Sequence, residues 1–143
     1  MSAANTAPQA VRAGVGLWCA LAAFLLVQTA FSWAGRSALQ QQLVANHAAA
    51  PEQAADRTLQ LLLINTGIAV VFAAGYVVLG LLILTRRPWS RIGVSVLLAV
   101  QVVMMLGSQS LTVVNLFVLV LGGAAAWCCW SKTGTEWVTG EHE

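Results

Sequence analysis

Four amide side chains are the strongest polar groups inside the long apolar stretches of this chain. They are Gln28, Asn65, Gln101 and Asn115. Amides in hydrocarbon form hydrogen bonds across helices, because lipid tails offer them no other partner. The same groups can instead line a polar pocket for a neutral ligand or a lipid headgroup. The sequence leaves both interpretations open, structural hydrogen bonding or a binding layer.

Ionisable side chains are scarce, with seven Lys or Arg, five Asp or Glu and two His among 143 residues. We predict that none of them lies within a membrane span. Ion-coupled transporters and intramembrane hydrolases nearly always place such groups there, because the desolvated group does the chemical work. His47 and His142 fall outside the apolar stretches, so no histidine pair is expected to hold a haem between helices. These absences predict a protein that is not an enzyme, with no catalytic residues, no metal and no cofactor.

Three cysteines, Cys19, Cys128 and Cys129, fall near one predicted membrane surface. The adjacent pair allows acylation or binding of a soft metal ion. Small apolar packing is the more common role of such residues. No disulfide is expected, because the cytoplasmic side of a cell membrane is reducing.

The composition indicates the class of protein in which these polar and sulfur-containing groups lie. Hydrophobic residues make up 59% of the chain and charged residues 8%, whereas about a quarter of a soluble domain is charged. This excludes a soluble enzyme, a nucleic-acid-binding protein and a disordered chain. A helix needs about 20 residues to cross the hydrocarbon core. The gaps between charged residues therefore predict four spans, at 13–35, 58–85, 89–107 and 111–130.

The four spans predict an all-α, polytopic membrane protein, an antiparallel four-transmembrane-helix bundle in a single membrane domain. The polar residues from Gly107 to Ser110 suit a tight turn between the last two spans. Counting ~1.5 Å per residue from the outer ends places all four amides roughly 6–11 Å below the outer boundary. The apolar run 13–27 has the length of a signal peptide, but apolar character continues through Trp33, which favours a retained span.

Basic residues predict the orientation in the membrane. Five lie on one side of the predicted spans and two, Arg36 and Arg57, on the other. The positive-inside rule then places both termini in the cytoplasm of a multi-pass protein of the cell membrane. Amphipathic rings prefer the headgroup level, so the tryptophans are predicted to be interfacial anchors. Those expected at the inner surface are Trp18, Trp89, Trp127 and Trp130, and Trp33 is expected at the outer one.

Two segments lie outside the predicted spans. The outer loop, 36–57, is rich in helix-forming residues. It predicts an outward extension of the first span, a reversal near 48–51 and a long helix from Pro51 to Thr85. This loop is either a spacer or a surface on which a partner docks. The tail, 131–143, is predicted to be a mobile, acidic cytoplasmic segment.

The connection between the second and third spans carries the most distinctive local motif. Arg86, Arg87 and Arg91 are predicted to contact anionic lipid headgroups, although setting the topology or docking a partner would also explain them. The pattern Trp89-Ser90-Arg91-Ile92 before an apolar hairpin resembles small four-helix membrane proteins of high-GC Gram-positive bacteria, which often have Trp-Ala-Arg-Ile there. The resemblance covers roughly the second half of the chain. It implies a topology and an actinobacterial-like source, but no activity.

The sequence predicts an accessory, scaffold or regulatory subunit of a membrane complex. Its expected partners are membrane lipids and other membrane subunits, or a second copy of itself, and not nucleic acid. A small permease or channel-like oligomer built around the amides is the alternative. A holin-like protein is the third, because the chain is short and multispanning and has a charged tail.

Overall fold

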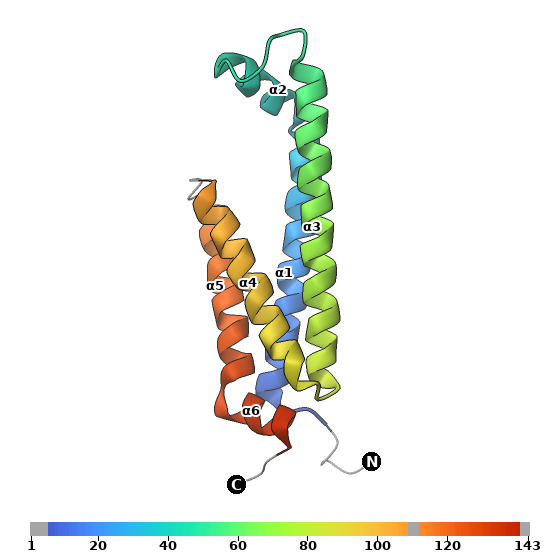
Figure 1. Ribbon diagram of the computed structural model, residues 1–143, viewed down its shortest axis with the longest axis vertical. Helices are drawn as coiled ribbons and strands as arrows, with labels where there is room; N and C mark the ends of the chain where they lie inside the picture. Colours follow the sequence, from blue (N-terminus) through green and yellow to red (C-terminus); the bar gives the residue numbers. More distant parts are fainter. Residues whose placement is uncertain (1–5, 109–111, 141–143) are drawn as a thin grey trace. The chain divides into compact units, whose positions relative to one another are not determined.

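The described part of the chain is entirely helical. The computed structural model describes residues 6–108 and 112–140, and within these ranges it has six helices and no strand (Figure 1). The helices are α1 (Gln9–Ala34), α2 (Arg36–Ala45), α3 (Ala54–Leu84), α4 (Pro88–Gly107), α5 (Val113–Trp130) and α6 (Lys132–Thr139). The all-α prediction is confirmed for these residues. Half of the turn predicted between the last two spans, Gln109 and Ser110, lies outside the described residues.

Four of these helices are long and apolar enough to cross a membrane: α1, α3, α4 and α5. They match the four predicted spans, which supports a membrane protein. The second begins four residues earlier than predicted, at Ala54. At 31 residues α3 is about 46 Å long, longer than the ~30 Å hydrocarbon core that it would cross.

The prediction that no ionisable residue lies within a span does not hold for the helices that could cross a membrane. They contain Arg12 in α1, Asp56 and Arg57 in α3, and Arg91 in α4. Arg91 lies in the first turn of α4 and is buried. The predicted span 89–107 already included it, and Pro88 starts α4 one residue earlier still. Proline suits the first turn of a helix, where its missing N–H leaves no hydrogen bond unmade.

The chain divides into two compact units, which we describe one at a time. The smaller unit is Ala23–Ala73, and the larger unit combines Met1–Ala22 with Ala74–Glu143. In the smaller unit α1 continues into α2 through a bend at Gly35. Its N–H donates to the carbonyl of Phe31 at 2.9 Å, and its own carbonyl accepts from the N–H of Leu39 at 3.1 Å. The helix therefore continues beyond the first predicted span, as far as Ala45, and that it does so on the outer side of the membrane remains a prediction.

The chain reverses direction after α2, close to the predicted position. His47 has a φ of 54°, in the left-handed region that ends a helix. The new helix was predicted from Pro51, but α3 begins at Ala54. Residues 51–53 form a turn instead, in which the N–H of Gln53 donates to the carbonyl of Ala50 at 2.9 Å.

The tail does not have the predicted structure between Lys132 and Thr139. A mobile segment was expected, but Lys132–Thr139 forms α6, whose Gly134, Trp137 and Val138 are buried (Figure 1). Ser131 starts this helix, since its hydroxyl accepts from the N–H of Gly134 at 3.3 Å. Gly140 ends it with a φ of 74°. The consecutive apolar residues Trp137 and Val138 give α6 a buried face. The composition of the tail alone did not indicate this face.

Candidate functional site

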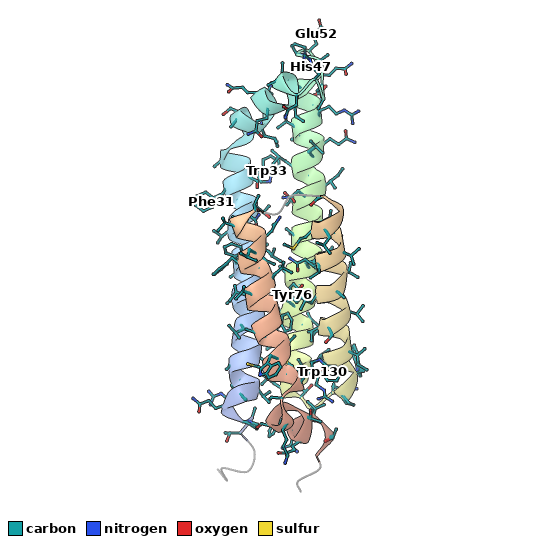
Figure 2. All side chains as sticks on the ribbon, turned by 90° about the vertical axis from the view of Figure 1, so that its left-hand side faces the viewer. Phe31, Trp33, His47, Glu52, Tyr76 and Trp130 are labelled. Carbon is teal, nitrogen blue, oxygen red and sulfur yellow. The ribbon has the colours of Figure 1, made fainter. Side chains whose placement is uncertain are left out.

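A polar and aromatic cluster in the larger unit joins four helices. Trp18 of α1 stacks on Tyr76 of α3, with ring centres 5.1 Å apart and an interplanar angle of 12°. The indole Nε1 of Trp18 donates to the Sγ of Cys129 on α5 at 3.4 Å. The Tyr76 hydroxyl donates to the Oε1 of Gln101 on α4. We call these four residues the Trp18 cluster; Tyr76 is labelled in Figure 2.

Three members of the Trp18 cluster are buried. Trp18 and Tyr76 have no exposed surface, and Cys129 is 1% exposed, whereas Gln101 is half-buried. The indole N–H, the phenol hydroxyl, the thiol and the amide oxygen bind one another, and this favours a structural role over ligand binding. A buried thiol that accepts a hydrogen bond from an indole also favours the packing interpretation of Cys129 over acylation.

Two members of this cluster were misjudged or missed by sequence reasoning. Trp18 was predicted to anchor the chain at the inner interface, and this is wrong, because its ring is fully buried. Trp89, Trp127 and Trp130 are at least half exposed, at 54%, 81% and 53%. Tyr76 was not singled out, although it is the only tyrosine of the chain and lies deep in an apolar stretch. A phenol at that position needs a hydrogen-bond partner, and this signal would have found it.

The four predicted amides fall into two units. Gln101 and Asn115 belong to the larger unit, where Gln101 accepts the Tyr76 hydrogen bond and Asn115 is half-buried in the first turn of α5. Gln28 and Asn65 belong to the smaller unit, where Gln28 is half-buried and Asn65 is exposed. Gln101 therefore takes part in a hydrogen bond between helices, which favours the structural interpretation, and a single layer of all four amides remains a prediction.

In the smaller unit the contact between α1 and α3 is made by the neighbour of Asn65. The Nε1 of Trp33 donates to the Oγ1 of Thr66 at 2.9 Å. The same hydroxyl donates to the carbonyl of Leu62 at 2.7 Å, one turn earlier in α3. Figure 2 shows Trp33 directed toward α3 and Phe31, which is 73% exposed, directed away from it. Trp33 was predicted as an outer anchor, and it also holds two helices together.

A second cluster, which we call the α6 contact site, joins the α3–α4 connection to the tail. Its members are Arg86, Arg91, Trp130, Thr135 and Trp137. The Nη1 of Arg91 donates to the Oγ1 of Thr135 at 3.0 Å, and its guanidinium carbon lies 4.9 Å from the ring centre of Trp130. The guanidinium carbon of Arg86 lies 4.0 Å from the ring centre of Trp137. Two of the three predicted lipid-contacting arginines are thus engaged by α5 and α6.

The third arginine, Arg87, is exposed at the start of α4. Within residues 6–108 and 112–140 there is no group of three or more His, Cys, Asp or Glu side chains able to hold a metal ion.

Removing the Tyr76–Gln101 hydrogen bond is expected to weaken the contact between α3 and α4. Interhelical hydrogen bonds in membranes contribute about 0.6–2 kcal/mol. We expect Y76F and Q101L each to lower the unfolding free energy by about that amount, and the double variant to cost less than their sum. Unfolding in mixed micelles with increasing dodecyl sulfate measures all three. Fully additive effects would contradict the bond.

Comparisons with known proteins yield no match: no family model, no curated protein and no solved structure matches this chain.

Proposed function

We propose that this chain is a non-enzymatic integral membrane protein that serves as an accessory, scaffold or regulatory subunit of a membrane complex. In this proposal α1, α3, α4 and α5 form an antiparallel bundle in the cell membrane, with both termini in the cytoplasm. The non-enzymatic part is supported by the Trp18 cluster, whose polar groups bind one another. The orientation is supported by the excess of basic residues on the side of the termini.

One observation carries the subunit proposal: Asn65 is exposed on α3 in a strongly apolar surface. Its neighbours Leu61, Ile64 and Ile68 are exposed by 45%, 53% and 38%. An amide among such residues finds no hydrogen-bond partner in lipid, but it finds one in another membrane helix. A helix from a partner subunit, or from a second copy, would supply that partner.

The experiment compares N65L with Q42L, which removes an exposed amide from α2, outside the predicted spans. Each tagged full-length chain is extracted in mild detergent, and its mass is measured by light scattering after size exclusion. We expect the wild type and Q42L to elute in a stoichiometric complex. N65L should dissociate about tenfold more readily, as the loss of about 1–2 kcal/mol at one interhelical bond implies. A wild type that elutes as a stable lone monomer would overturn the proposal.

A further inference from the structure

Among the residues that the structure describes, the α6 contact site holds a positive charge whose partners are neutral. Arg91 is only 9% exposed, and the groups that contact its guanidinium among the described residues are the Thr135 hydroxyl and the Trp130 ring. A guanidinium is always charged and presents five N–H donors. Burying a guanidinium without an anion costs more free energy than a hydrogen bond to a hydroxyl and a contact with an aromatic ring recover. Within residues 6–108 and 112–140, the docked position of α6 therefore leaves the charge of Arg91 without an anionic partner.

Two donors in this site have no hydrogen-bond acceptor in the described part of the chain. Among the described residues, the buried polar side-chain atoms without a partner are the Nε of Arg91 and the Nε1 of Trp137. Trp137 is 8% exposed and lies on the buried face of α6. Both atoms are N–H donors. An anion with several oxygens would supply the acceptor that Arg91 lacks. For Trp137, which belongs to α6, the missing acceptor makes the docked position of α6 less favourable.

The helix that covers the site is short. α6 has eight residues, and a helix of this length is marginal without tertiary contacts. Its contacts with the arginines are one cation–π pair, between Arg86 and Trp137, and one hydrogen bond, between Arg91 and Thr135, and both contribute modestly. Anything that binds the two guanidiniums more strongly will compete with α6 for them.

We propose that Arg86 and Arg91 form a binding site for the phosphate group of an anionic phospholipid, and that α6 is its releasable cover. Phosphate oxygens accept paired hydrogen bonds from guanidinium groups, which Thr135 and the Trp137 ring cannot do. When a headgroup binds, α6 leaves the arginines and its residues enter solvent or the membrane surface. The docked and released forms thus report the negative charge of the adjacent leaflet. Arg87 is exposed while α6 is docked, so α6 and the headgroup do not compete for it.

The chain contains its own probe for this release. Lys132, the first residue of α6, is the only lysine in the sequence. A lysine-specific endoproteinase therefore cuts once, between Lys132 and Thr133. Proteolysis of a transiently open segment follows the population of the open form. The test uses the purified full-length chain in lipid nanodiscs, where both membrane faces are accessible, and needs no partner protein. Its result is therefore independent of the subunit proposal.

We expect cleavage to be about tenfold faster in nanodiscs of equal parts phosphatidylglycerol and phosphatidylcholine than in phosphatidylcholine alone, as two competing arginines imply. In R86Q and R91Q the ratio of the two rates should fall toward one. R87Q removes the same charge from an exposed neighbour and should keep the wild-type ratio. Arg86 is exposed, so R86Q is expected to fold. It therefore tests the proposal even if R91Q does not fold.

A second lysine corrects for recruitment of the protease to a charged surface. Q53K, in the exposed turn before α3, provides a reference cleavage site in the same molecule. Equal rates in the two lipids, once corrected by this site, would overturn the proposal. So would a loss of the ratio in R87Q as large as in R86Q. Inorganic phosphate that accelerates cleavage equally in phosphatidylcholine nanodiscs would also overturn it, because the ligand would then be a free anion.

Discussion

Replacing Trp18 with alanine is expected to cause the largest loss of stability in this chain, about 3–5 kcal/mol. The indole has no exposed surface, stacks on Tyr76 at 5.1 Å and donates to Cys129 at 3.4 Å. W18A therefore removes a large buried side chain and leaves a cavity among α1, α3 and α5. It also removes the donor that the Cys129 sulfur uses. The free energy of unfolding in mixed micelles measures the effect.

W127A is the matched control, since Trp127 is 81% exposed on α5. The same substitution there leaves no cavity, and we expect a change within about 0.5 kcal/mol, as for surface sites in general. Equal losses in W18A and W127A would contradict the placement of Trp18 in the core. A loss confined to W127A would show that interfacial anchoring outweighs packing in this protein.

The long helices were predictable from this sequence because many residues in each apolar stretch indicate the same structure. The second apolar stretch contains 28 residues without a charge, so no single residue decides whether it forms a helix. Helix ends depend on fewer residues, and there the predictions failed. Proline suits a first helical turn as well as a tight turn, and near Pro51 the chain forms the turn, three residues before α3 begins.

The side-chain clusters were harder to predict, since they depend on which face of a helix turns inward. Composition placed Trp18 near a membrane surface, but it did not distinguish an anchor from a core residue. Val11, Val15 and Ala22 share its face and are buried with it, and this spacing carried the missing information. No such pattern exists for the α6 contact site, because it joins Arg86 to Trp137 across 50 residues of sequence.

Gly134 permits α6 to fold back against the end of α5, and alanine there should prevent it. An added Cβ would lie 2.6 Å from the carbonyl oxygen of Cys129 and 2.9 Å from that of Cys128. These are backbone atoms, so no rotamer change relieves the contact, and overpacking of this kind costs about 1–3 kcal/mol. We expect G134A to be cut after Lys132 about tenfold faster than the wild type, in line with that cost.

The sign of this effect separates two physical causes. Alanine favours a helix over glycine by about 1 kcal/mol, so a variant governed by helix propensity alone would keep α6 folded and be cut more slowly. G123A supplies the reference, because Gly123 is exposed on α5 and an added Cβ meets nothing within 4 Å. Its cleavage rate should equal that of the wild type. If steric release is correct, G134A will also be cut at one rate in neutral and anionic nanodiscs, since its α6 no longer competes for Arg86 and Arg91. Slower cleavage in G134A would instead mean that the chain end adapts to the added methyl group, and that Gly134 does not control the docking of α6.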